Sequence, residues 1–138
     1  MRVLVPLLLF ASTTAALGGT LTVDVQGVPD SQGSVRAALF DGPSGFPSKK
    51  AAKAFTSAKA AQGRIELSFA DLPAGRYAIV AFQDSNDNKV LDRNFLGKPT
   101  EGLGFSNGAK PNFGPPPFEN AAFAFDGKMQ TVTIRLNY

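Results

Sequence analysis

The sequence predicts an all-β protein: a single antiparallel β-sandwich, prealbumin-like or immunoglobulin-like, with one short helix and a long ordered loop. Three observations lead to this prediction. Short apolar or alternating segments recur with turn residues between them, an Asp-Gly pair near the C-terminus is typical of a β-hairpin, and only one segment suits a helix. The six expected strands are 20–25, 34–40, 64–69, 76–82, 121–125 and 130–136.

The first three expected strands show the alternation of half-buried strands and end at residues that favour turns. Residues 20–25 alternate between apolar and polar side chains, and the pattern breaks at Gly27. Residues 34–40 end at Asp41-Gly42-Pro43, and residues 64–69 alternate again. These segments therefore favour strands with one face in the core.

The strand expected at 76–82 follows the turn Leu72-Pro73-Ala74-Gly75 and alternates least. Because it has apolar residues on both faces, we expect a central strand that is covered on both sides. Its expected core residues are Tyr77, Ile79 and Ala81 on one face and Ala78, Val80 and Phe82 on the other.

The two C-terminal strands flank Asp126-Gly127. Asp-Gly favours the tight turn of a two-residue hairpin, so we expect residues 121–125 and 130–136 to pair with each other.

The helical candidate is residues 48–61, with Pro47 near its first turn, where the missing N–H of proline is harmless. Phe55 is its only large apolar side chain, and lysines stand among its alanines, which is typical of an exposed helix. The lysines could instead contact an anionic surface. They are Lys49, Lys50, Lys53 and Lys59.

Residues 94–120 are rich in Gly, Pro and Phe. A long segment without secondary structure is unusual in a compact domain and is normally functional or disordered. Disordered segments are poor in aromatic residues, so we expect an ordered loop that packs its rings on the sandwich. The rings could line a ligand groove or form a lid over one end of the core. They are Phe95, Phe105, Phe113 and Phe118.

The N-terminal segment is typical of a secretory signal peptide. An apolar stretch follows Arg2, and small residues follow at 12–16. The apolar stretch is shorter than the roughly 20 residues that a spanning helix needs. We therefore expect residues 1–18 to be removed, with cleavage near 16–18, and residues 19–138 to form one β-sandwich domain that is periplasmic or secreted.

The composition excludes several classes of chemistry. The chain has no Cys and no His, which removes disulfides, thiolate catalysis, His-based triads and the usual zinc sites. Without Arg2 the formal net charge would be about +2, and so small a surplus does not indicate nucleic-acid binding. No second apolar stretch is long enough to span a membrane.

Residues 84–92 have oxygen-bearing side chains at alternate positions, directly after an apolar strand, so we expect them at the rim of the scaffold. Calcium takes six to eight oxygen ligands, and calcium loops supply them from every second residue and a backbone carbonyl. Lys89 stands at the glycine position of an EF-hand loop and Phe95 at the position of its last acid, so this is not an EF-hand. The candidate ligands are Asp84, Asn86, Asn88, the Val90 carbonyl and Asp92, with Asp87, Glu101 or Glu119 as a candidate extra ligand.

Asp and Asn could equally shape this segment without metal, because their side chains hydrogen-bond their own backbone in turns. If calcium binds, the few carboxylates imply a weak site, with a Kd of roughly 10⁻⁴ to 10⁻³ M.

Several blocks of the chain resemble a family of small exported bacterial proteins catalogued as domain of unknown function 2141. The resemblance covers essentially the whole mature chain and implies an exported β-sandwich similar to prealbumin-like or carboxypeptidase-regulatory-like modules. It implies no activity. Gln83 stands where the family pattern usually has His, so any contribution of that His is absent here. The blocks are residues 72–78, 84–88, 91–92, 96–99, 101–102, 104–107 and 117–121.

Three function classes remain. We expect a non-enzymatic exported module that binds a ligand or partner in the cell envelope, with rings exposed around a cleft. The first alternative is a structural or protein-interaction module without metal, with buried rings and an unpaired strand edge. The second is a minor carboxylate-based hydrolase, which needs two carboxyl groups facing each other across an open groove. Its acids would come from Asp84, Asp87, Asp92, Glu101 or Glu119.

Overall fold

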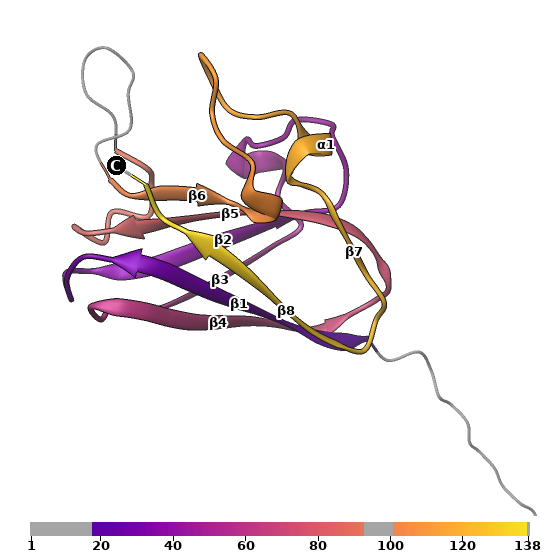
Figure 1. Ribbon diagram of the computed structural model, residues 1–138, viewed down its shortest axis with the longest axis horizontal. Helices are drawn as coiled ribbons and strands as arrows, with labels where there is room; N and C mark the ends of the chain where they lie inside the picture. Colours follow the sequence, from indigo (N-terminus) through magenta and orange to yellow (C-terminus); the bar gives the residue numbers. More distant parts are fainter. Residues whose placement is uncertain (1–17, 93–100, 138) are drawn as a thin grey trace, which may run out of the picture.

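The computed structural model describes residues 18–92 and 101–137 and folds them into two β-sheets (Figure 1). One sheet has three strands in the order β4-β1-β8. The other has five, in the order β3-β2-β5-β6, with β7 paired to β5. The predicted all-β class is confirmed. The strands are β1 (Gly19–Val28), β2 (Ser34–Phe40), β3 (Ala54–Lys59), β4 (Gly63–Leu72), β5 (Gly75–Asp84), β6 (Leu103–Phe105), β7 (Phe123–Phe125) and β8 (Met129–Arg135). The short helices are η1 (Lys49–Ala51), η2 (Ser106–Gly108) and α1 (Phe118–Ala121).

The strand pairing differs from the expected one at the C-terminus. β1 pairs antiparallel with β4 but parallel with β8, so a purely antiparallel arrangement is wrong for that pair. These two strands come from opposite ends of the described chain, and a long connection permits parallel pairing.

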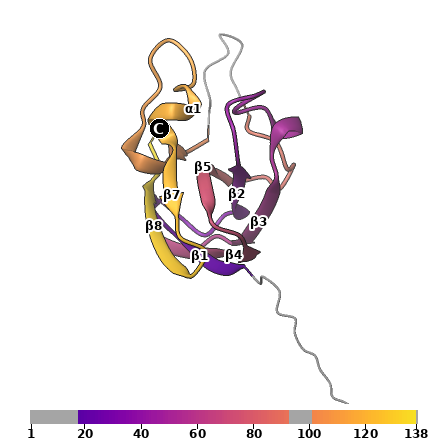
Figure 2. The same ribbon diagram turned by 90° about the vertical axis from the view of Figure 1, so that its right-hand side faces the viewer.

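The expected hairpin is also wrong, because β7 pairs with β5 while β8 pairs with β1. Asp126-Gly127 does form a turn, in which Asp126 Oδ1 accepts from Lys128 N at 2.8 Å and Gly127 has a φ of 84°. The turn carries the chain from one sheet to the other (Figure 2).

The expected helix at 48–61 is wrong beyond its first turn. Only Lys49–Ala51 is helical, and Ala54–Lys59 forms β3, the edge strand beside β2. Residues 54–59 alternate between half-buried and exposed, so their alanines and lysines suit a strand with one covered face as well as a helix. Pairing with β2 therefore decides the conformation.

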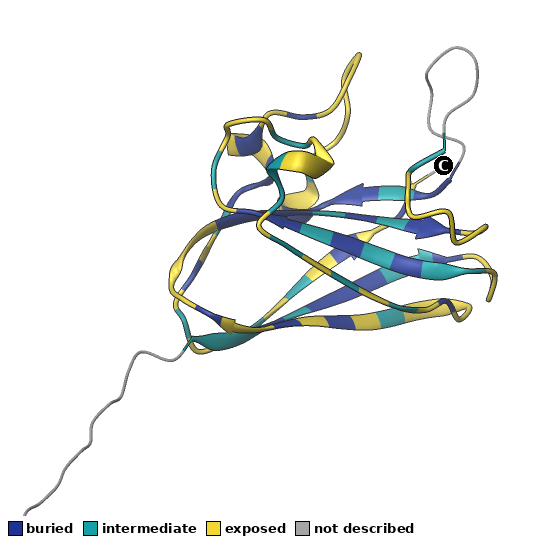
Figure 3. Cartoon of the chain, turned by 180° about the vertical axis from the view of Figure 1, so that it is seen from behind, coloured by how far each residue is buried: buried dark blue, intermediate teal, exposed yellow. Residues whose placement is uncertain are grey.

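The main core lies between the two sheets (Figure 3). Its side chains come from the inward faces of β1, β2, β4, β5 and β8 and are almost wholly excluded from solvent. The predicted central strand is confirmed as β5, in which Tyr77, Ala78, Ile79 and Ala81 are buried. Val80 and Phe82, on its outer face, are only half-buried.

A second cluster packs on the outer face of the five-stranded sheet. Phe46 is its centre, with ring centroids 4.9 Å from Phe40, 5.7 Å from Phe118 and 6.4 Å from Phe105. Two of the predicted loop rings, Phe105 and Phe118, are therefore buried against the sheet. This cluster covers one part of the outer face.

The predicted signal peptide falls almost wholly outside the described residues. Of the helices formed by residues 18–92 and 101–137, none has the length and apolar character to cross a bilayer.

Candidate functional site: a groove on the five-stranded sheet

The outer face of the five-stranded sheet is open beside the second cluster. A groove of about 1200 Å³ lies there. Its walls are three segments: residues 47–49 at η1, residues 89–91 after β5, and residues 109–115 after η2. The segments around η1 and α1 stand on the same side of this sheet in Figure 1.

The strand register produces the floor of the groove. Side chains of neighbouring strands that share a register position and a face lie in one row across the sheet. Two such rows line the groove and contain mostly apolar side chains. One row is Phe55, Ala38, Val80 and Phe105, and the next is Ser57, Arg36, Phe82 and Leu103.

The residues that line the groove differ from the four phenylalanines expected from the sequence. Phe105 lines the groove and Phe113 stands fully exposed on its wall, but Phe118 lies in the second cluster and does not line it. Phe95 lies outside the described residues. Three further rings line the groove that the sequence did not indicate as groove residues: Phe40, Phe55 and Phe82. The signal for Phe82 was present in the two-sided apolar pattern of residues 76–82, whereas Phe55 was assigned to a helix.

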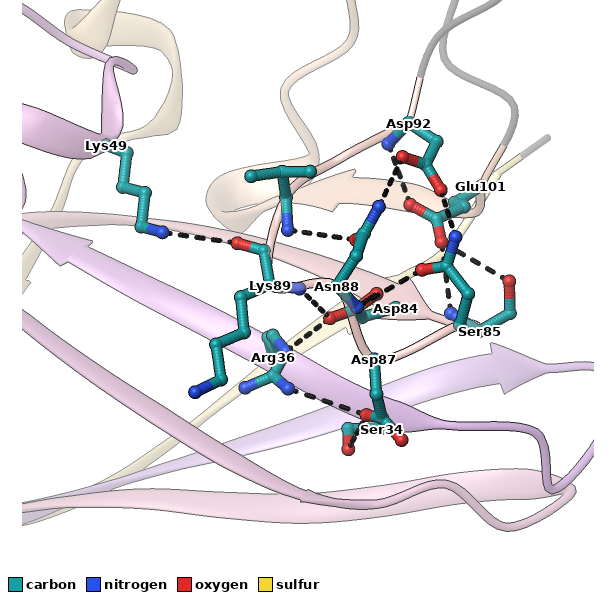
Figure 4. Close-up of polar contacts among 12 residues, drawn as sticks. Ser34, Arg36, Lys49, Asp84, Ser85, Asp87, Asn88, Lys89, Asp92 and Glu101 are labelled. Atoms are coloured by element: carbon teal, nitrogen blue, oxygen red, sulfur yellow. Dashed lines mark hydrogen bonds and ion pairs between the residues drawn. The ribbon is translucent and has the colours of Figure 1, made fainter.

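The segment 84–92 closes one end of the groove and is organised by Asp84, the last residue of β5. Asp84 Oδ2 accepts from Arg36 Nε and from Lys89 N, each at 2.7 Å, and Oδ1 accepts from Asn88 N at 3.1 Å (Figure 4). Asp84 stands at the end of β5, at the rim where the sequence predicts it, but its side chain is fully buried. Its side chain belongs to the outer face of the sheet, and its own loop folds over it.

The pKa of the Asp84 carboxyl is lowered from its ordinary value. Burial acts to raise its pKa, but the hydrogen bonds and charge of Arg36 and the amides of Lys89 and Asn88 outweigh burial, and the net pKa is lowered. Arg36 also lies 3.5 Å from Asp87 Oδ1 through Nη2, and it lines the groove. One guanidinium therefore links the loop to the groove floor.

Glu101 fixes the far end of this segment. It is almost wholly buried, and its Oε2 accepts from Ser85 N at 3.0 Å while its Oε1 accepts from Asp92 N at 2.8 Å. Asp92 accepts from the side-chain amides of Asn86 and Asn88, each at 2.7 Å. These contacts satisfy the carboxylates within the segment (Figure 4).

The candidate calcium ligands therefore lie together, but their polar atoms face one another. Asn86 Oδ1 accepts from Asn88 N, and Asn88 Oδ1 accepts from Val90 N, as in turns shaped by Asn. Lys89 has a φ of 68°, at the position where EF-hand loops have Gly. Within the described ranges, no group of three or more Asp, Glu, His or Cys side chains is arranged to hold a metal ion.

The candidate extra ligands are split between two places. Asp87 accepts from Ser34 Oγ at 2.6 Å and Glu101 lies beside Asp92, so both are close to the loop. Glu119 instead pairs with Arg76, at the opposite end of β5.

Gln83, the residue before Asp84 in β5, holds the end of this strand against the turn between β1 and β2. Its side-chain amide donates to Asp30 Oδ1 at 2.8 Å and to the Gln32 carbonyl at 2.9 Å, which ties the turn between β1 and β2 to β5. Gln83 is thus part of the framework at this strand end.

The sequence profile of one family matches residues 23–133, from within β1 to within β8. The chain belongs to this family, which is described as an uncharacterized protein conserved in bacteria (DUF2141). The resemblance noted in the sequence is therefore confirmed. No curated protein and no solved structure matches the chain. The segment 84–92 and all of the groove lining except Asn137 lie within the matched DUF2141 region.

Proposed function

We propose that this DUF2141 chain is a non-enzymatic exported module of the cell envelope that holds an apolar ligand in the groove on its five-stranded sheet. The main observation that supports this proposal is that Val80 and Phe82, on the outer face of β5, are only half-buried. Val80, Phe82 and Leu103 form an apolar floor with walls around it, and no other part of residues 18–92 and 101–137 fills the space above it. We also propose that the two layers form a prealbumin-like or immunoglobulin-like sandwich, with the groove on one outer face.

The energetics favour an apolar occupant. Covering apolar surface contributes about 25 cal/mol per Å² removed from water, and binding sites usually combine an apolar lining with a few polar groups. At about 1200 Å³ the groove is somewhat larger than the roughly 300–1,000 Å³ of most small-molecule sites. The groove therefore suits an elongated or multi-ring molecule.

The arrangement of the acids supports binding without catalysis. A carboxylate hydrolase needs two carboxyl groups on opposite sides of its substrate. Among the described acids that were candidates, Glu101 lines the groove but both of its oxygens accept backbone amides, and Asp84 is buried beneath its loop. Glu119 lies at the far end of β5, paired with Arg76.

The test is a fluorescence titration with N-phenyl-1-naphthylamine, an uncharged aromatic probe. We expect saturable binding, weakened about fivefold or more by Phe82→Ser, because the change removes a ring from the floor. Phe55→Ser is a second variant that should fold normally, because Phe55 is 57% exposed. Met129→Ser is the matched control, since Met129 is 82% exposed and does not line the groove. Absence of saturable binding, or equal losses in Phe55→Ser and Met129→Ser, would overturn the proposal.

A weak calcium site in the segment 84–92 is a second proposal. The positive φ of Lys89 and the ordered oxygens of Asn86 and Asn88 support it, because a calcium loop needs a sharp turn at that position. Arg36 opposes it by occupying Asp84 Oδ2. The purely structural alternative, in which the same residues only form turns, predicts no response to calcium.

A further inference from the structure

We propose that the ligand of the groove is an amphipathic anion: an apolar body on the sheet floor, with a carboxylate held by Lys49 and Lys89 at the groove wall. This inference rests on the proposed function, because it names the ligand class of the same groove.

The first argument is that cationic residues from the floor and from two walls line the groove: Arg36, Lys49 and Lys89. The segment 84–92 places the backbone N of Lys89 and the Arg36 guanidinium on the same oxygen, Asp84 Oδ2. From the opposite wall, Lys49 Nζ donates to the Lys89 carbonyl at 3.2 Å. Lys49 thus reaches from the η1 wall to the backbone of Lys89 on the facing wall (Figure 4).

The second argument is that the nearby acids do not neutralise these lysines. Asp84 and Asp87 pair with Arg36, and Glu101 faces backbone amides. Among the ion pairs of the described residues, none includes Lys49 or Lys89. Both lysines are exposed, so their ammonium groups remain accessible to an acid from solvent.

The third argument is the combination of charge and shape. Exposed acidic side chains are not part of the groove lining, whereas exposed lysines stand directly beside the apolar floor, in the part of the chain that the structure describes. An apolar molecule without charge would leave the lysines unused, and a small inorganic anion would leave the floor uncovered. A molecule with an apolar body and one carboxylate satisfies both.

The experiment compares two probes with one fluorophore, dansyl-aminoundecanoic acid and its methyl ester. The full-length mature chain should bind the acid more tightly than the ester. Lys49→Met and Lys89→Met should each lower the affinity for the acid about two- to fivefold, which is the effect of losing an exposed ion pair. The affinity for the ester should stay nearly unchanged. Lys128→Met is the matched control, because Lys128 is exposed on the turn between β7 and β8 and does not line the groove.

The outcomes separate this inference from the proposed function. If the acid and the ester bind with equal affinity and Phe55→Ser weakens the binding of both, the inference of an anionic ligand is overturned. The proposal of an apolar groove then stands. Failure of both probes to bind would overturn both proposals. A loss of acid binding in Lys128→Met as large as in Lys49→Met would show that net charge alone is responsible and would overturn the inference. Added salt should weaken binding of the acid more than binding of the ester, since salt screens exposed charges.

Discussion

Replacement of Asp84 tests how the loop at the groove is held. Asp84→Ala removes a fully buried carboxylate and leaves three donors without their acceptor: Arg36 Nε and the amides of Asn88 and Lys89. Breaking a buried pair by removing one partner costs about 3–5 kcal/mol, because the remaining charge is left uncompensated. A domain of this size has a stability of about 5–15 kcal/mol, so the variant should fold but be markedly weakened.

The measurement is urea unfolding followed by circular dichroism. With a urea m-value of about 1–3 kcal/mol/M, the midpoint should fall by at least about 1 M. The control is Glu119→Ala, because the Arg76–Glu119 pair is as short, at 2.6 Å, but its side chains are 54% and 62% exposed. An exposed pair contributes about 1 kcal/mol or less. Equal losses in Asp84→Ala and Glu119→Ala would refute the reasoning that burial makes the difference.

The pH dependence of the same variant provides an independent check. The folded pKa of Asp84 is lowered, so its contribution to stability is fully present above its unfolded pKa of about 3.9. That contribution is lost as the pH falls through the lower, folded pKa. The stability difference between the parent and Asp84→Ala should therefore be constant from pH 7 to about 5 and should shrink below pH 4. A difference that grows on acidification would contradict the assignment.

The remaining predictions concern export, the core, a close contact and calcium. The N-terminus of protein recovered from an envelope fraction should begin near residues 17–19, and intact Met1 there would contradict export. Ile79→Asp should prevent cooperative folding, because it buries a carboxylate without a partner; a soluble variant with a sharp melt would show that β5 is misassigned. Gly104→Ala should destabilise, since a Cβ there would lie 2.5 Å from the Arg135 carbonyl oxygen, and an unchanged melting temperature would mean that β6 and β8 are farther apart. Calcium at tens of millimolar should raise the melting temperature more than magnesium does, and at 100 times the Kd it should add about 2.7 kcal/mol to the free energy of unfolding. Asp92→Ala should remove this response, and a flat titration at constant ionic strength would leave the segment as a turn.

The acidic segment shows why the choice of variant for the calcium test depends on the structure. The sequence placed Asp84 at a rim, where Asp84→Ala would leave the fold intact. The structure buries its carboxylate under Arg36, so that variant now tests stability and not metal binding. Asp92 is the better choice, because the hydrogen bonds of its carboxylate with the described residues come from side-chain amides of the same loop.

The sequence by itself determined the elements whose pattern is local. The period-two alternation at 20–25 and 64–69, and the two-sided apolar run at 76–82, identified β1, β4 and the central strand β5. Of the phenylalanines in residues 94–120, Phe105 and Phe118 are buried, as expected for rings that pack on the sheets. The side chains of residues 84–92 identified a polar loop. Each of these follows from side-chain periodicity or composition within a few residues, which the chain carries wherever it folds.

The tertiary structure decided what depends on partners distant in sequence. Pairing with β2 makes a strand of Ala54–Lys59, whose alanines suit a helix equally well, and pairing of β8 with β1 replaces the hairpin expected at Asp126-Gly127. The groove is likewise non-local: Phe55, Arg36, Phe82 and Leu103 meet only because three strand registers align them across one sheet face. Register is set by the sum of many backbone and core contacts, so no single segment contains the information that places these side chains together.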